Sequence, residues 1–221
     1  MGGFNISRGR YRVKVLNLYA GIGGNRKLWT DCDVTAVENE PIIAKFYKER
    51  YPKDIVIVAD AHQYLLDHYK EFDFIWSSIP CQSHSGLRRT SVYKGQNKAI
   101  YPDMKLYEEI IFLQNFAPLD TKWVVENVKP YYDYLIPGKE IGRHIVWSNF
   151  TIPYAEIEND CIPIEHIKSS SEVYGVKLPK NFGIRKDQVL RNMVNPKLGL
   201  YIFNEALKRK QPKQLQIKME L

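Results

Sequence analysis

The sequence predicts an α/β fold in which a parallel sheet carries helices on both faces. Short apolar runs alternate along the chain with segments of helical periodicity. A glycine-rich turn follows the first apolar run, and a Pro-Cys-Gln tripeptide follows a later one. Strands that alternate with helices favour parallel pairing through right-handed crossovers. Both features are therefore expected at the carboxyl edge of one sheet, where open α/β sheets bind their ligands.

Strands are predicted wherever a short apolar run, rich in branched and aromatic residues, is bounded by polar or turn residues. These runs cover residues 13–19, 34–37, 55–58, 73–78, 122–125 and 145–150. Their length and composition are typical of strands buried in a parallel sheet.

Helices are predicted between the strands. Pro41 stands at a plausible first helical turn, and residues 62–70 and 104–116 carry apolar side chains at helical spacing. Pro196 opens a last amphipathic helix. Residues 151–187 carry scattered prolines without a period, so we expect a small loop-rich insertion there.

Length, charge and cysteine content bound the possible functions. The chain has 221 residues, of which 44% are hydrophobic, enough for one α/β domain with a small appendage. It contains neither an apolar run long enough to cross a membrane nor the pattern of a signal peptide. Three cysteines without C-x-x-C spacing favour a reduced, cytoplasmic protein with no disulfide framework and no structural zinc. The net charge of +7 is compatible with a polyanionic partner.

The turn Gly21-Ile22-Gly23-Gly24, placed between a strand and a predicted helix, lets the backbone approach a ligand closely. Glu38 ends the second strand, where an acid typically binds ribose hydroxyls, and Asp60 ends the third, where a carboxylate can accept from an adenine amine. The turn departs from G-x-G-x-x-G and lacks G-K-[ST]. This favours a ligand without a pyrophosphate, such as S-adenosylmethionine, over NAD.

Cys81 is the candidate nucleophile, because it follows Pro80 in a polar loop beyond a strand and Arg88 and Arg89 are expected near it to favour the thiolate. Glu126, flanked by valines, is the candidate proton donor. Cys32 and Cys161 are interpreted as small buried hydrophobic residues.

A basic and aromatic segment follows Cys81. It contains Arg88, Arg89, Lys94 and Lys98, interleaved with His84, Tyr93 and Tyr101. Basic side chains mixed with aromatic ones favour a nucleic acid over a small anion.

Taken in order, these motifs resemble the cytosine-C5 DNA methyltransferase family. Residues 17–24, Asn-Leu-Tyr-Ala-Gly-Ile-Gly-Gly, resemble its first motif, which usually has Phe where this chain has Tyr19. Val37-Glu38 and Asp60-Ala61 resemble the second and third, Pro80-Cys81-Gln82 the catalytic loop, and Glu126-Asn127-Val128 the Glu-Asn-Val motif. Residues 188–194 resemble the last motif, and the short length is similar to that of compact phage-type members.

The resemblance implies a Rossmann-like sheet that binds S-adenosylmethionine and methylates cytosine in double-stranded DNA, without a metal. Cys81 would attack C6 of a flipped-out base, Glu126 would hold or protonate N3, and Arg143 would support the base or its phosphate. The implied cofactor residues are Tyr19, Ala20, Gly21, Gly23, Gly24, Glu38, Asn39, Asp60, Ala61, Pro80, Asn192 and Val194. The implied nucleic-acid contacts are Gln82, Ser85, Arg88, Arg89, Lys94 and Lys98, in a loop from Ser83 to Pro102 that would close over the base.

The same resemblance implies a division of the chain. Residues 1–150 would form the catalytic and cofactor-binding domain, 151–187 a minimal target-recognition segment, and 188–221 a C-terminal segment that packs back on the catalytic domain. A bacterium or a phage-infected host cell would be the setting, with restriction-modification as a possible context.

The chain departs from the family pattern at several positions. His84 replaces the usual Phe, the eighth motif lacks its Gln and one Arg, and Arg191 stands where Gly normally precedes Asn192. The recognition region is short, which bears on sequence specificity more than on chemistry.

Alternative functions remain open at this point. An RNA cytosine-C5 methyltransferase fits a compact recognition segment equally well, and a short insertion is also compatible with a subunit that needs a specificity partner. An amino-methyltransferase is disfavoured, because Ile79-Pro80-Cys81 places a thiol where such enzymes usually carry an aromatic residue after Pro-Pro.

Overall fold

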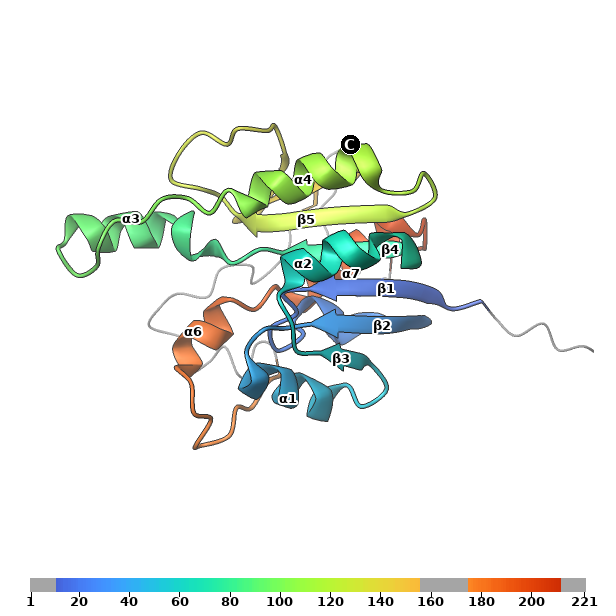
Figure 1. Cartoon of the computed structure of the whole chain (residues 1–221), viewed down its shortest axis with the longest axis horizontal. Coiled ribbons are helices and arrows are strands. Elements are labelled where there is room, and N and C mark those ends of the chain that lie inside the picture. The colour runs from blue at the N-terminus through green and yellow to red at the C-terminus, as the bar shows by residue number, and fades with distance from the viewer. Residues whose placement is uncertain (1–10, 156–174, 212–221) are drawn as a thin grey trace, which may run out of the picture.

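The computed structural model describes residues 11–155 and 175–211, which contain one seven-stranded sheet in the order β3-β2-β1-β4-β5-β7-β6 (Figure 1). The strands are β1 (Val13–Leu18), β2 (Cys32–Val37), β3 (Ile55–Ile57), β4 (Phe74–Ser78), β5 (Lys122–Val128), β6 (Lys139–Ile141) and β7 (His144–Ser148). The six predicted strands are confirmed to within a few residues. β6 was not predicted, because its residues Lys-Glu-Ile form no apolar run.

The parallel part of the sheet contains a reversal of strand order. β1 pairs in parallel with β2 on one side and with β4 on the other, while β3 and β5 extend the two halves outward. Ligands of open α/β sheets bind beyond the carboxyl ends of the strands at such a reversal. Tyr19 and Ile79 follow directly on β1 and β4 at this place.

The prediction of a parallel sheet is wrong at β7, and the unpredicted strand β6 is antiparallel as well. β7 pairs antiparallel with β5, and β6 pairs antiparallel with β7. Parallel strands need a long crossover, whereas residues 129–138 between β5 and β6 form no helix. Gly142, with φ of +57°, lies in the turn between β6 and β7.

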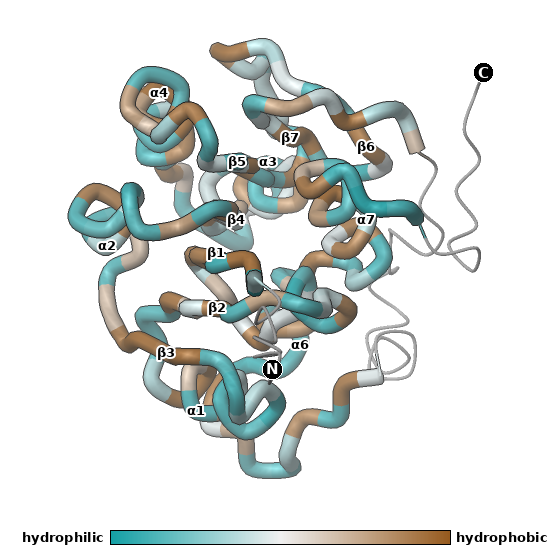
Figure 2. The backbone as a smooth tube through the Cα atoms, turned by 90° about the vertical axis from the view of Figure 1, so that its right-hand side faces the viewer, coloured by the Kyte–Doolittle hydropathy of each residue, from teal (hydrophilic) through white to brown (hydrophobic). Residues whose placement is uncertain are grey.

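Helices cover both faces of the sheet (Figure 2). The face with Leu16, Ile75 and Val125 packs against α2 (Ala61–His68) and α4 (Lys105–Phe116). The opposite face, with Val15 and Trp76, packs against α7 (Pro196–Ala206). On that side α1 (Pro41–Arg50) rests on β2 through Tyr47 and Ala36. A short 3₁₀ turn, η2 (Tyr69–Glu71), continues α2.

The helix expected directly after the glycine-rich turn is not formed. One 3₁₀ turn, η1 (Asn25–Leu28), stands there instead. The last helix occupies the space alongside, because a Cβ on Gly199 would lie 2.4 Å from the Asn25 carbonyl oxygen. The Trp29 Nε1–H donates to the Gly199 carbonyl at 3.0 Å, so α7 and η1 are held together.

The segment expected as a loop between Ser83 and Pro102 contains a helix, α3 (Gly86–Tyr93). Its start is fixed by Ser85, whose hydroxyl accepts from the Arg88 N–H. α3 buries none of its residues, which is why no apolar stripe marks it in the sequence. In Figure 1 it projects away from the sheet beyond the ends of the strands.

Two further short helical segments complete the described fold. Cys81–Ser83 forms the 3₁₀ turn η3, and α6 (Lys186–Arg191) precedes α7. Around the expected insertion, Ile152 and Ala155 enter the core beneath α7, and Val176 and Phe182 pack with α6. Residues 156–174 and Cys161 lie outside the described residues, whereas Cys32 is buried as predicted. Within the described ranges no helix is long and apolar enough to cross a membrane.

Candidate active site

A cavity of about 310 Å³ lies at the carboxyl ends of β1, β2, β4 and β5. The segment from α6 to Val194 and the start of β7 complete its wall. Thirteen of the predicted site residues line it: Tyr19, Ala20, Gly21, Gly24, Glu38, Asn39, Pro80, Cys81, Gln82, Glu126, Arg143, Asn192 and Val194. The fold thus brings most of the predicted cofactor residues and all three predicted catalytic residues into one space.

Glu38 binds the glycine-rich turn to the end of β2. Its carboxylate accepts from the Gly21 N–H and the Glu40 N–H, each at 2.9 Å. Burial raises the pKa of Glu38, and the backbone N–H groups oppose part of that rise. A carboxylate held in this way keeps lone pairs for further hydrogen bonds at the cavity wall.

Two positions of the turn require glycine, each for a different structural reason. Gly21 has a φ of +54°, a left-handed conformation that costs other residues energy. Gly24 is required by close approach, since a Cβ there would lie 2.3 Å from both the Met193 side chain and the Val194 carbonyl. The segment resembling the last motif therefore lies directly against the first.

Three predicted cofactor residues do not line this cavity. Asp60 caps α2 by accepting from the Gln63 N–H at 2.9 Å, and that bond lowers its pKa. Ala61, the first residue of α2, is buried in the core, and Gly23 packs on the rings of Tyr47 and Tyr51.

Cys81 lies at the start of η3, beside Glu126 and Arg143. Burial raises the pKa of its thiol, the Glu126 carboxylate raises it further, and Arg143 opposes both effects. The expectation that Arg88 and Arg89 favour the thiolate is wrong. Their guanidinium groups donate to the carbonyls of Lys98 and Tyr131, at 2.8 and 3.0 Å, because α3 carries them away along its exposed faces.

Glu126 is buried at the end of β5 and held from two sides. The Ser78 hydroxyl donates to one carboxylate oxygen at 2.8 Å, and His144 Nδ1 lies 2.5 Å from the other. Trp76 Nε1–H donates to the Ser78 hydroxyl in turn, at 2.7 Å. These bonds fix the carboxylate while leaving each oxygen a second lone pair.

Sequence reasoning missed His144 and Ser78. Ser78 could have been found, because it is a polar residue at the end of a predicted strand, and that strand pairs with the strand of Glu126. His144 reaches Glu126 only because β7 runs antiparallel to β5, which no local pattern indicates.

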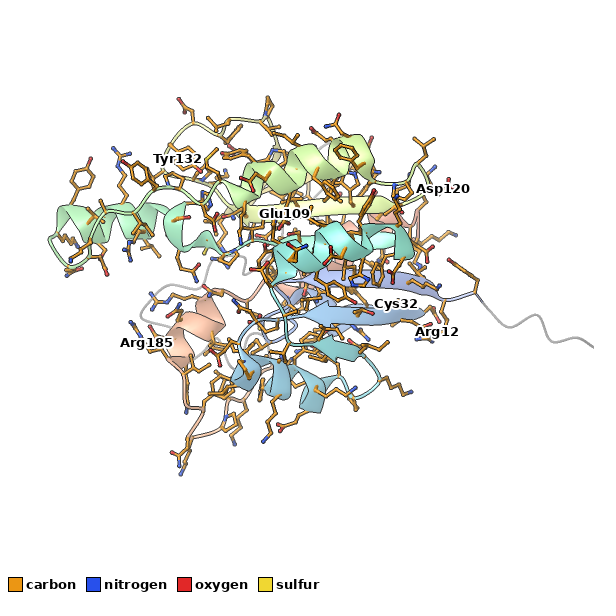
Figure 3. All side chains as sticks on the ribbon, in the orientation of Figure 1. Arg12, Cys32, Glu109, Asp120, Tyr132 and Arg185 are labelled. Atoms are coloured by element: carbon orange, nitrogen blue, oxygen red, sulfur yellow. The ribbon has the colours of Figure 1, made fainter. Side chains whose placement is uncertain are left out.

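The loop that carries Cys81 is braced by its neighbours. The Asn127 side chain donates to the Ile79 carbonyl at 3.0 Å, just before Pro80. His84, fully buried, hydrogen-bonds through Nδ1 to the Tyr132 hydroxyl at 2.6 Å. Tyr132 is labelled in Figure 3, above the base of α3. His84, which stands where the family usually has Phe, therefore has a hydrogen-bond partner in Tyr132.

The predicted nucleic-acid residues fall into two groups. Gln82 lines the cavity, and Ser85 caps α3. Lys94 and Lys98 are exposed in and beyond the end of α3, where Tyr93 and Tyr101 are 76% and 94% exposed. Arg89 lies between the Tyr93 and Tyr131 rings, 5.5 Å from the centre of each. Over residues 11–155 and 175–211, His, Cys, Asp and Glu side chains form no group that could hold a metal ion.

Comparisons with known proteins place the chain in a family. The family model described as C-5 cytosine-specific DNA methylase matches residues 13–129, more than half of the chain. A comparison with curated protein sequences gave no match.

Among solved structures, the methyltransferase EhMeth from Entamoeba histolytica aligns with 90% of this chain and 99% of its own, at 12% identity and a TM-score of 0.51. A SAM-dependent methyltransferase from Agrobacterium tumefaciens aligns over 56% of this chain, at 13% identity and a TM-score of 0.39. A DNMT2 mutant from Spodoptera frugiperda aligns over 56%, at 23% identity and a TM-score of 0.38. The chain covers 41% and 38% of those two proteins.

The similarity to EhMeth shows the fold alone, which is the Rossmann-like sheet predicted from the sequence. The family match adds the chemistry, namely methylation of cytosine at C5 with S-adenosylmethionine as cofactor. The chain belongs to the C-5 cytosine-specific DNA methylase family.

Proposed function

We propose that this protein methylates cytosine C5 in double-stranded DNA through a covalent bond between Cys81 and C6 of a flipped-out base. The observation that carries the proposal is the meeting of Cys81, Glu126 and Arg143 in one cavity with the glycine-rich turn and Glu38. A thiol, an acid and a cation are thus available beside a cofactor site.

The cofactor site fits S-adenosylmethionine. Glu38 would accept from the ribose hydroxyls, and the exposed backbone of the turn beside it permits close approach. Asn192 and Val194 would close the site from the C-terminal segment. When bound, this cofactor supplies an electrophilic methyl group.

Cys81 supplies the electron pair that cytosine C5 lacks. The thiolate adds to C6, a C–S bond forms, and the C5–C6 π electrons move into the ring, which makes C5 nucleophilic. C5 would then bond to the methyl group as the methyl–sulfur bond breaks and its electrons stay on sulfur, which leaves S-adenosylhomocysteine, and a base would remove the C5 proton. The electrons of the broken C5–H bond re-form the C5–C6 double bond and expel the thiolate, so the enzyme is regenerated.

Glu126 keeps charge from building on the ring during attack. Held by Ser78 and His144, it would accept from the exocyclic amine with a remaining lone pair and, in its protonated form, donate its proton to N3. Arg143 lowers the pKa of the Cys81 thiol against the effects of burial and Glu126, and so assists formation of the thiolate.

The exposed α3 segment is proposed as the DNA contact. Lys94 and Lys98 would bind phosphates, and the stack of Tyr93, Arg89 and Tyr131 would orient the strand that carries the flipped base. Phosphate contacts position a substrate without specifying its sequence.

The test is an assay of the product. The purified protein is incubated with S-adenosylmethionine and unmethylated duplex DNA, and 5-methylcytosine is quantified by mass spectrometry after digestion. Product that disappears in Cys81→Ala, with cofactor binding retained, supports the proposal. Product on a structured RNA and none on DNA would overturn the DNA assignment, and product made by Cys81→Ala would overturn the covalent mechanism.

A further inference from the structure

Glu109 is a buried carboxylate that the proposed chemistry does not use. It lies on α4, fully shielded from solvent, on the side of the helix that faces the sheet (labelled in Figure 3). Burying a carboxylate is costly unless hydrogen-bond donors surround it. Its presence in the core therefore points to a role that an apolar residue could not fill.

Three other elements supply donors to Glu109. The Tyr19 hydroxyl donates to Oε1 at 2.7 Å, and His62 Nδ1, on α2, lies 3.1 Å from the same oxygen. The Ser77 hydroxyl, on β4, donates to Oε2 at 2.6 Å. Burial raises the pKa of Tyr19, and the Glu109 carboxylate raises it further, so the tyrosine keeps its proton and acts as a donor.

Tyr19 connects this cluster to the cavity. It lines the cavity and begins the turn to Gly21, and its φ of +53° is left-handed, a conformation that is unfavourable for a residue with a Cβ. The next residues are hydrogen-bonded within the turn, with Gly23 N–H donating to the Ala20 carbonyl at 2.9 Å. A shift of Tyr19 would therefore move the backbone that Glu38 holds from the other side.

We propose that Glu109 is a positioning residue for the cofactor site. By accepting from the Tyr19 hydroxyl, Glu109 holds Tyr19, and with it the glycine-rich turn, in the conformation that binds the cofactor. The inference rests on the proposed location of that site. It is particular to this chain, since the first motif of the family usually carries Phe at the position of Tyr19, with no hydroxyl to bond.

The experiment compares two deletions of one hydrogen bond to the same carboxylate. Tyr19→Phe removes the bond from the turn and keeps the aromatic ring, whereas Ser77→Ala removes the bond from β4, which does not reach the turn. Affinity for S-adenosylhomocysteine is measured by calorimetry, and the melting temperature of each variant is recorded. Since Glu109 keeps two partners in both variants, both are expected to fold.

Tyr19→Phe is expected to weaken binding roughly tenfold, the size typical of removing one hydrogen bond to a charged group. Ser77→Ala should lower the melting temperature without changing affinity more than about twofold. Glu109→Gln in the Tyr19→Phe background should weaken binding no further, because the two residues act through one bond.

Unchanged affinity in Tyr19→Phe, or an equal loss in Ser77→Ala, would overturn the inference and leave Glu109 a purely structural residue. Glu38→Ala separates this from failure of the site itself. If Glu38→Ala also binds normally, the cofactor does not use this turn and both proposals fall. If only Glu38→Ala loses affinity, the site stands and the role of Glu109 falls.

Discussion

Cys81 and Glu126, at the ends of β4 and β5, are held in place differently from α3, although the loop that carries Cys81 leads directly into that helix. Glu126 is buried and bonded to neighbouring strands on both sides, and the loop of Cys81 is tied back through Asn127. α3 buries no residue and ends at the exposed Tyr93, and the exposed Lys94, Lys98 and Tyr101 follow it. Groups that perform chemistry must be fixed to within a fraction of an ångström, whereas groups that bind a polyanion can be mobile. Substitutions in the two regions should therefore fail in different ways.

The largest effect is expected at Glu126. Glu126→Gln should reduce turnover roughly 10³-fold, within the range for loss of a general acid, and leave cofactor affinity nearly unchanged. Product formation and calorimetry measure the two quantities. Glu140→Gln, on the exposed strand β6, is the matched control and should behave as wild type. A loss confined to DNA binding would contradict the assignment of Glu126 to the chemical step.

Glu38 should show the reverse pattern at the cofactor end of the cavity. Glu38→Ala removes the acceptor of the Gly21 and Glu40 N–H groups. Cofactor affinity should fall by roughly 10- to 100-fold, as expected for removal of charged hydrogen bonds, with a smaller effect on turnover at saturating cofactor. Glu49→Ala, on the exposed face of α1, serves as control. Equal losses in both variants would indicate damage to α1 instead.

Alkylation of the Cys81 thiol tests which arginine stabilises its thiolate. Arg143 lowers the pKa of Cys81, so its removal should raise that pKa further. Iodoacetamide alkylation of Arg143→Gln should be roughly tenfold slower at pH 8, since a nearby opposite charge typically shifts a pKa by about one unit or more. Arg89→Gln should alkylate at the wild-type rate. The opposite ranking would return the activating role to α3.

Lys94 and Lys98 test the exposed side of the comparison. The double substitution to Ala should weaken DNA binding and reduce the slope of log affinity against log salt by about two, one for each phosphate that the protein then leaves unneutralised. Cofactor affinity should not change. Lys45→Ala, on α1, should leave the slope intact. A slope unaffected by the double substitution would mean that DNA binds elsewhere.

The smallest effect concerns His62 and the stability of the buried cluster. Its hydrogen bond to Glu109 raises the pKa of His62, with Glu108 adding to the rise and desolvation and Lys105 opposing it. A raised folded-state pKa stabilises the protein fully below pH 6.5, and that contribution is lost as the pH rises through the raised value. The melting temperature should therefore decline above pH 6.5, by no more than about 4 °C. His62→Gln should flatten this decline, and a slope that persists would assign it to another group.

Most of the parallel sheet was predictable because its information is local. Apolar runs such as 13–18 mark strands, and residue type at the strand ends marked Gly21, Glu38, Cys81 and Glu126, which now line one cavity. Their roles stay predictions, as does the division of the chain at residues 150 and 187.

The remainder depends on contacts between distant segments. His144 acquires its partner from strand pairing, and α3 has no buried face that could leave a pattern. Arg88 and Arg89 are near Cys81 in sequence but are carried away by the helix that Ser85 starts. Asp60 ends a strand as expected, yet its side chain caps α2 instead of lining the cavity.

The close approach of Gly24 to Val194 has a consequence for synthesis. The glycine turn leaves the ribosome well before residues 188–194, which form the wall against it, and before α7, which packs on η1 behind it. A nascent chain can form its central strands early and still lack a complete cofactor pocket until this late segment has emerged. The proposed site can thus take up its cofactor only after this late segment has been translated.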